Sequence, residues 1–335
     1  MRILGIDTIR AVAALAVVLI HIFPTPSNAG FLKIIVTQAA RFAVPFFFVG
    51  SGFFYAQRIH NGVSPKQALK KSMKRLVPVY FFWSLLYFFN PPIETIFRVG
   101  VDVVYRDRLI QLFSNFQNAI LVGPGSHLWF FVSLILAIIT FHLLAGYRKR
   151  KIIITLAIFL YIVGVMGKAY ILTPIGLNLH INTRNFIFFS MLPFTLGYYL
   201  YRTEGKWKSF YFGLLLWVGG TILHFSEIVM LQKVYGMPMI RQNYVFSTVI
   251  MGIGAFVVGR SNLSFLKWRF SVKLGTLSLG IYAGHILIAC RLHLIKKFIT
   301  SDFVWMIIAP LLVFVSAAFL SYLLSKISFT KRFVS

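Results

Sequence analysis

Long apolar runs recur along the whole sequence and leave little room for anything else. The 335-residue chain is 59% hydrophobic and only 12% charged, whereas a soluble domain carries about 25% charged residues. An apolar run of about 20 residues can cross a bilayer as a helix. We therefore expect an all-α, polytopic membrane bundle of about ten transmembrane helices, forming one domain over residues 1–335. The runs fall at 6–23, 40–57, 76–90, 128–145, 152–167, 185–201, 210–225, 243–259, 274–292 and 303–325.

The basic residues between these runs predict the orientation of the bundle. If the N-terminus is inside, the inner segments hold 21 Lys and Arg and the outer segments hold 12. Cytoplasmic loops carry such an excess, so we expect an N-in, C-in arrangement. The run RKRK at 148–151 and the stretch 58–75 contribute most to it. The same pattern explains most of the net charge of +27, and because the charges are dispersed among short loops we expect no nucleic-acid partner.

Three ionisable residues lie on one face of the first run. Asp7 precedes Arg10 by three positions and can pair with it on a helix. His21 follows Arg10 by eleven positions, which brings it back to within about 20° of the same face and about 16 Å along the axis. Charged groups are costly inside a bilayer, so each is a candidate functional residue. A purely structural Asp7–Arg10 ion pair is the alternative interpretation.

A secretory signal peptide is a second interpretation of this N-terminal segment. Met1 and Arg2, a ten-residue apolar core and the small residues SNAG at 27–30 fit that pattern. A signal peptide does not need a stripe of ionisable residues that flanks its core. We therefore favour a helix that is retained in the mature protein.

The remaining polar residues exclude several kinds of catalytic site. The chain has seven acidic residues and one cysteine, Cys290, so we expect no metal site and no disulfide framework. Metal-protease, nucleophile-elbow, phosphate-loop and dinucleotide motifs are missing from the sequence. What remains is histidine as a base with arginine anchors. That combination suits removing a proton from a hydroxyl while an anionic co-substrate is held.

Five segments, in order along the chain, resemble the acyltransferase 3 family of integral membrane acyltransferases. The first segment begins with GIDTIR, which ends at Arg10. Ten residues then separate Arg10 from His21, and this spacing is similar to the family's Arg-x10-His motif. In its length and its HLWF segment, the chain is most similar to the bacterial surface-polysaccharide O-acetyltransferases. The chain departs from the family pattern at Gly50, where a bulky residue is common, and at Ile286–Leu287, where a proline is usual. The other four segments are RFAVPFFFVGSGFF (41–54), KRLVPVYFFW (74–83), HLWFF (127–131) and SLGIYAGHIL (278–287).

The resemblance implies transfer of an acetyl group from cytoplasmic acetyl-CoA to a hydroxyl of a cell-envelope glycan or lipid-linked sugar. It implies a multi-pass protein of the bacterial inner membrane, surrounded by membrane lipids. Acetyl-CoA is then the donor co-substrate, and no permanently bound cofactor is expected. By this analogy His21 is the catalytic base, and Arg10 and Arg75 bind the CoA.

The predicted orientation sorts the candidate residues into two sets. Arg10, Arg58, Lys74 and Arg75 fall at the cytoplasmic end, where they would meet the CoA phosphates. We expect the catalytic group to comprise His21, Arg10, Asp7 and Arg41, with Arg41 steadying the developing oxyanion. The residues expected near the acceptor, unless they are only packing or interfacial side chains, are His127, Trp129 and His285.

Two other functions remain open from the sequence. In a proton-coupled transporter of an anionic small molecule, His21 would be a proton relay and Arg10 a substrate anchor. A non-catalytic scaffold of a polysaccharide-export complex would need neither residue.

Two local features add further expectations. Ser64 and Pro65 predict the start of a short helix, and the nearly neutral segment 91–127 is expected outside, over a site or sealing the fold.

Overall fold

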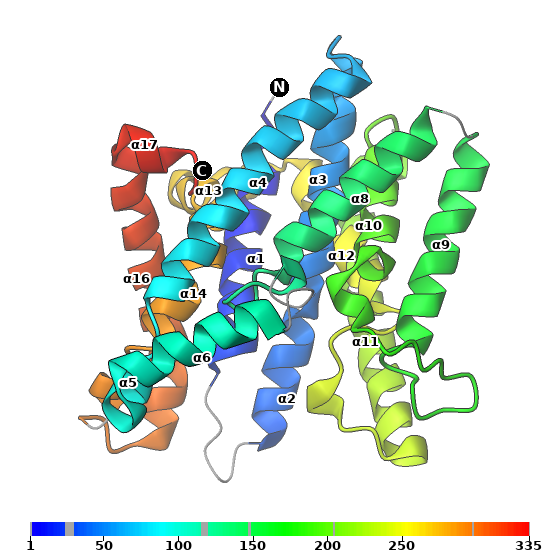
Figure 1. The fold of residues 1–335 in the computed structure, drawn as a ribbon. Helices are drawn as coiled ribbons and strands as arrows, with labels where there is room; N and C mark the ends of the chain where they lie inside the picture. Colours follow the sequence, from blue (N-terminus) through cyan, green and yellow to red (C-terminus); the bar gives the residue numbers. More distant parts are fainter. Residues whose placement is uncertain are drawn as a thin grey trace.

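The computed structural model describes residues 2–23, 30–114, 120–146, 149–203, 205–296 and 298–334. The small residues at 27–29 and Arg148, which entered the sequence argument, lie outside this part. Within it the chain is helical, and no strand is found there (Figure 1). The first half contains α1 (Leu4–Ile22), α2 (Gly30–Ala39), η1 (Ala40–Phe42), α3 (Ala43–His60), α4 (Pro65–Phe89), α5 (Ile93–Val99), α6 (Val101–Ser114), α8 (Trp129–Ala145) and α9 (Arg150–Met166).

The second half continues in the same manner, with short 3-10 turns between longer α-helices. It contains η2 (Thr183–Asn185), α10 (Ile187–Leu200), η3 (Gly205–Lys208), α11 (Phe210–Tyr235), η4 (Met239–Arg241), α12 (Thr248–Ser261), η5 (Ser264–Lys267), α13 (Arg269–Thr276), α14 (Ser278–Ala289), α15 (His293–Lys296), α16 (Asp302–Lys326) and α17 (Ser328–Lys331).

Each of the ten apolar runs contains a helix, but fewer helices are long enough to cross a membrane by themselves. Within the described residues, five helices or unbroken helix pairs meet the length and composition of a membrane span, or six when α13 and α14 count as one. Three further apolar helices, α8, α10 and α12, are 10–17 residues long. The chain is thus an all-helical bundle with five or six candidate spans, and the count of ten and the N-in, C-in orientation stay predictions.

The last-but-one apolar run is a broken helix. We expected residues 274–292 to form one span, but α13 and α14 meet at an angle of 70°. A side chain at Gly275 would overlap the backbone of Asp7, so α13 lies directly against α1. The break lets α13 cross the start of α1 while α14 continues into the bundle.

Helix α4 begins as the sequence predicts and then runs further than expected. The Ser64 side chain caps it by accepting a hydrogen bond from the Gln67 N–H at 3.3 Å, and Pro65 occupies the first turn. This helix is not short, since it continues through Pro78 to Phe89 and includes the third apolar run. The basic stretch and the span are therefore one element.

Helix α1 runs through the middle of the bundle (Figure 1). It contacts α3, α12, α13, α14 and α16, and small side chains such as Ala13 and Ala14 are fully buried on it. Helices α3 and α10 also approach closely, because a side chain at Gly52 or Gly197 would overlap the other helix's backbone. The glycine of the SGF motif therefore has a packing role.

The segment after α4 crosses one end of the bundle. Helices α5 and α6 lie across the end at which α1 finishes, away from the N-terminus (Figure 1). Arg108 of α6 donates to the main-chain oxygen of Tyr87 at 2.7 Å, which fixes α6 to the end of α4. The expected cover at this end is thus helical, and whether it faces outward stays a prediction.

Candidate active site

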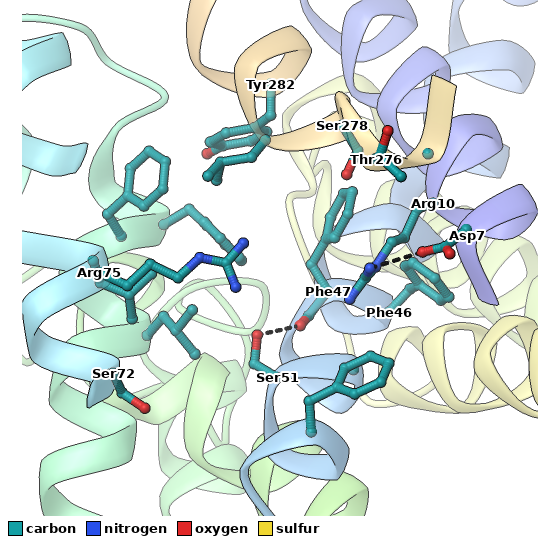
Figure 2. A pocket seen from close by; sticks show the side chains of 18 of the residues that line it. Asp7, Arg10, Phe46, Phe47, Ser51, Ser72, Arg75, Thr276, Ser278 and Tyr282 are labelled. Carbon is teal, nitrogen blue, oxygen red and sulfur yellow. Dashed lines mark hydrogen bonds and ion pairs between the residues drawn. The ribbon is translucent and has the colours of Figure 1, made fainter. Parts of the chain in front are cut away.

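A cavity of about 460 Å³ opens between α1, α3, α4, α8 and the α13–α14 bend. We call it the arginine cavity, because four arginines line it and Asp7 is the one carboxylate among its described lining residues. Figure 2 shows the guanidinium groups of Arg10 and Arg75 reaching into it from opposite sides. Such a concentration of guanidinium groups favours an anionic ligand with several phosphates. The four arginines are Arg2, Arg10, Arg58 and Arg75.

Asp7 holds two of these arginines in place. Its carboxylate is 3% exposed and accepts from Arg2 Nε at 2.6 Å and from Arg10 Nη1 at 2.9 Å. The Arg10 guanidinium also lies 4.9 Å from the centre of the Phe54 ring. The expected pairing of Asp7 with Arg10 is therefore present, and it orients Arg10 toward the cavity. Asp7 thus acts by orienting arginine side chains. It lies about four helical turns from His21, the candidate base on the same helix.

The other two arginines come from the last turn of α3 and the middle of α4. Arg58 donates to the Ser72 hydroxyl at 3.1 Å, which ties the two helices together at the mouth of the cavity. Lys74, which the sequence groups with Arg75, is exposed and does not line the cavity. The two neighbours are about 100° apart around the helix, so only Arg75 can point inward.

Aromatic side chains form the deep wall of the arginine cavity. Phe130, Phe131 and Tyr282 line it, and the Phe130 and Tyr282 ring centroids are 5.2 Å apart. The Tyr282 hydroxyl donates to the main-chain oxygen of His127. Its ring centroid lies 5.7 Å from that of His127 and 6.2 Å from that of His285. One tyrosine therefore separates the cavity from a group of histidines.

Three histidines from distant parts of the chain meet beyond Tyr282. The ring centroids are 5.3 Å apart for His21 and His285, 6.3 Å for His21 and His127, and 5.0 Å for His127 and His285. We call these three residues the histidine cluster. It brings together one predicted catalytic residue and two predicted acceptor residues. Within the described part of the chain, no group of three His, Cys, Asp or Glu has the arrangement of a metal site.

The hydrogen bonds of two cluster members define their tautomers. His127 Nε2 lies 3.0 Å from the Ala283 oxygen, and His285 Nδ1 lies 2.6 Å from the Tyr282 oxygen. A carbonyl oxygen can only accept, so these nitrogens carry the protons and the opposite nitrogens present lone pairs. His127 Nδ1 and His285 Nε2 are buried and have no partner among the described residues. Both can therefore accept a proton or a hydrogen bond from a ligand.

His21 itself remains exposed beside these two buried rings. It lies within electrostatic reach of Arg41 and Arg184. Arg184 was not predicted from the sequence. Its guanidinium lies 4.9 Å from the centre of the Trp129 ring, so the predicted Trp129 contacts Arg184. Burial lowers the pKa of the Arg184 guanidinium from its ordinary value, although an arginine stays charged.

A second cavity, of about 750 Å³, lies at the end of the bundle that α6 crosses. Its lining includes η2 and the residues before it, so it adjoins Arg184. Amide, imidazole and guanidinium groups dominate its polar lining, which is suited to a ligand with many hydroxyls. Its polar side chains come from Arg108, Gln111, His180, Asn182 and Asn185.

Two residues outside the sequence-predicted site have defined contacts. Tyr282 is an aromatic packing residue by sequence, yet it contacts both the arginine cavity and the histidine cluster. His224 resembles a loop or interface residue, but it is fully buried and bonds Thr248 Oγ1 and Gln38 Oε1, each at 3.0 Å. Its α11 sequence carries no polar periodicity that would reveal this contact with α2 and α12.

Comparison with known proteins gives both a family and several relatives. A sequence profile of the acyltransferase 3 family, described as an acyltransferase domain, matches residues 3–327. An amino-acid racemase of Enterococcus faecalis is 28% identical over 313 residues, which cover 88% of this chain and 42% of that protein.

Two further curated relatives match a shorter stretch. A second amino-acid racemase of Enterococcus faecalis is 32% identical over 218 residues, or 61% of this chain and 29% of that protein. A serine/alanine racemase of Enterococcus gallinarum is 30% identical over 218 residues, or 61% of this chain and 30% of that protein. The chain thus spans less than half the length of these relatives. No solved structure matches it significantly.

Proposed function

Because the chain belongs to the acyltransferase 3 family, we propose that it transfers an acetyl group from cytoplasmic acetyl-CoA to a hydroxyl of a cell-envelope carbohydrate in the bacterial inner membrane. One observation carries the proposal. Tyr282 lines the arginine cavity, and the ring of this tyrosine contacts His127 and His285 of the histidine cluster. A donor with a phosphorylated end and a long thin arm fits such an arrangement.

The donor is assigned to the arginine cavity. Arg10, Arg58 and Arg75 supply guanidinium groups for the CoA phosphates, and their bidentate donors suit phosphate oxygens. The pantetheine arm and its thioester then extend between Phe130, Phe131 and Tyr282 toward the histidines. The cavity of about 460 Å³ accommodates the arm and part of the phosphate-bearing end, and the nucleotide extends beyond its mouth.

The reaction needs a base next to the acceptor hydroxyl. In our scheme the hydroxyl oxygen attacks the thioester carbonyl carbon while His21 takes the hydroxyl proton. Arg41 stabilises the negative charge on the carbonyl oxygen of the tetrahedral intermediate. The C–S bond then breaks and the departing thiolate takes the proton from His21. The products are an acetyl ester and CoA, and His21 is neutral again.

Histidines 127 and 285 have supporting roles in this scheme. Their lone-pair nitrogens accept hydrogen bonds from the acceptor hydroxyls or from His21, which orients the nucleophile. Trp129 provides an apolar face on which a sugar ring can stack. The second cavity supports a carbohydrate acceptor, because Gln111, Asn182 and Asn185 offer both donors and acceptors.

The racemase activity in the relatives' names is no part of this proposal. More than half of each of those proteins lies outside its match to this chain, so the names describe much longer molecules. A proton-coupled transporter remains the rival function. It uses His21 as a relay and moves a solute without consuming acetyl-CoA.

The test uses purified protein in lipid nanodiscs with radiolabelled acetyl-CoA and an envelope-glycan extract. We expect free CoA and a labelled ester to appear together. The His21→Gln variant should lower the rate by about 10²–10⁴, the usual value of a general base. His60→Gln, a change at an exposed histidine that lines neither cavity, should leave it unchanged. Solute uptake by proteoliposomes without any release of CoA would favour the transporter instead.

A further inference from the structure

Two arginines that converge beside His21 have no anionic partner in the described part of the chain. Arg41 lies in η1, between α2 and α3, and Arg184 lies in η2, before α10. Element η1 packs against α1, which carries His21, and η2 packs against α8. Both arginines act electrostatically on His21, and Arg184 acts on Arg41. Both arginines are half-buried. Like charges that approach each other repel, and partly desolvating a cation without an anionic partner is costly. An anion between them would relieve both costs.

None of the ion pairs among the described residues includes Arg41 or Arg184. Glu227 accepts from the Tyr170 hydroxyl at 2.9 Å and from the Ser247 N–H and hydroxyl at 3.1 and 2.8 Å. Arg41 Nε is buried and has no hydrogen-bond partner among the described residues. The site therefore carries a net positive charge and an unused donor.

Arg184 is held in a fixed orientation by uncharged groups. Its Nε donates to Asn185 Oδ1 at 3.2 Å and its Nη1 to Asn243 Oδ1 at 3.1 Å. Its guanidinium lies over the Trp129 ring at 4.9 Å. These contacts use Nε, Nη1 and one face of the group, so the Nη2 donors have no hydrogen-bond partner among the described neighbours and can bind a ligand. A preorganised guanidinium of this kind binds carboxylate and phosphate well.

We propose that Arg41 and Arg184 form an anion site beside His21, and that it binds a carboxylate or phosphate group of the acceptor. The substrate class rests on the proposed function, whereas anion binding does not. The site lies on the histidine side of Tyr282, so it is distinct from the arginine cavity. A guanidinium has five N–H donors, and Arg41 can therefore contact both this group and the oxyanion. The acceptor is thus an acidic or phosphorylated sugar.

Anion binding is measured first, in the absence of acetyl-CoA. Phenylglyoxal modification of the arginines is followed by mass spectrometry in the protein in nanodiscs, with inorganic phosphate, glucuronate or glucose added. We expect phosphate or glucuronate to slow the modification of Arg41 and Arg184 several-fold, and glucose to have no effect. The anion that gives the stronger protection shows whether the site prefers a phosphate or a carboxylate group. Equal modification rates at both arginines in all three solutions would overturn the proposal.

Variants then test whether the two arginines bind the same anion. Arg41→Gln should weaken the protection of Arg184 by about tenfold in anion concentration, the loss expected for one charged hydrogen bond. Arg98→Gln, the same charge change on exposed α5, should leave the protection intact. Arg75→Gln should also leave it intact, because Arg75 lines the other cavity. Unaltered protection of Arg184 in Arg41→Gln would contradict a shared site.

The acceptor class is tested last, in the acetyl-transfer assay. Glucuronate- or phosphate-bearing glycans should accept acetyl at least tenfold better than their neutral counterparts, and Arg184→Gln should abolish that preference. If no acetyl is transferred to any acceptor while the anions still protect both arginines, the proposed function fails and the anion site stands. Equal transfer to neutral and anionic glycans refutes the assignment of the site to the acceptor.

Discussion

The hydroxyl of Tyr282 donates a hydrogen bond to the main-chain oxygen of His127, while the ring of the same tyrosine lines the arginine cavity. One side chain therefore contacts both halves of the candidate site. Its position is set by α14, which starts at the 70° bend after α13. This side chain lies between the arginine cavity and the histidine cluster. Such a short separation suits acyl transfer from one to the other, because the reacting atoms must come within about 3–3.5 Å.

Removing the Tyr282 ring should uncouple the two halves of the reaction. Tyr282→Ala opens the arginine cavity toward the histidine cluster, so we expect water to reach the thioester more readily. We expect acetyl-CoA hydrolysis without acceptor to rise relative to transfer, measured as CoA release against labelled ester. Tyr282→Phe keeps the ring and loses one hydrogen bond, so it should keep the wild-type ratio and lose about 0.5–1.5 kcal/mol of stability. Identical ratios in the alanine variant and the wild type would argue against a separating role.

Two adjacent residues on α4 should differ sharply in their effect on donor binding. Arg75 reaches into the arginine cavity (Figure 2). Lys74 does not line this cavity. Loss of a hydrogen bond to a charged group costs about 1.5–3 kcal/mol, so Arg75→Gln should raise the KM for acetyl-CoA by about 10–150-fold. Lys74→Gln should change it less than about twofold. The KM values come from initial rates of CoA release, and similar shifts in the two variants would indicate a general effect of charge.

Asp7 should contribute more to stability than an acidic residue in an exposed pair. Asp7→Asn keeps the shape but loses charged hydrogen bonds to Arg2 and Arg10, so unfolding should become easier by about 1.5–3 kcal/mol. Asp302 pairs with Lys296 at 2.6 Å but is itself 57% exposed. Asp302→Asn should therefore cost less than about 1 kcal/mol. Thermal unfolding in detergent micelles compares the two, and an equal loss would refute the distinction.

Two glycines in one motif should respond differently to alanine. A methyl group at Gly52 would overlap the backbone of α10 at Phe194, whereas at Gly50 it would meet the Phe256 ring at 3.6 Å, an ordinary contact. Gly52→Ala should therefore cost about 1–3 kcal/mol through overpacking. Gly50→Ala should be nearly neutral in the same thermal unfolding assay. Equal stability of the two variants would show that α3 and α10 can separate at little cost.

Local patterns in the sequence were sufficient for the elements and for half of the candidate site. The 3.6-residue periodicity predicted the pairing of Asp7 with Arg10, and the Ser64–Pro65 signal predicted the start of α4. Each apolar run contains a helix. The order of the motifs predicted the acyltransferase family and drew attention to His127 and His285. These predictions succeed because each depends on residues close in sequence, or on a pattern that a family shares.

The remaining features depend on how distant segments approach one another. Arg184 lies in a loop without a motif, and only the fold brings it to Trp129 and Arg41. The bend at residue 277 follows from the packing of Gly275 on α1, which no periodicity within 274–292 indicates. Lys74 differs from Arg75 only in its direction around the helix. Hydropathy alone does not give that direction, because both residues belong to one basic stretch.

The aromatic layer at Tyr282 also has an electrical consequence. Water and ions that enter the arginine cavity bring the potential of the solution on that side as far as the tyrosine ring. In the predicted N-in orientation, we expect part of the transmembrane voltage to fall between this ring and exposed His21. Moving one elementary charge through 100 mV corresponds to about 2.3 kcal/mol. In the proposed reaction we therefore expect proton movement between the thioester and His21 to depend on the membrane voltage.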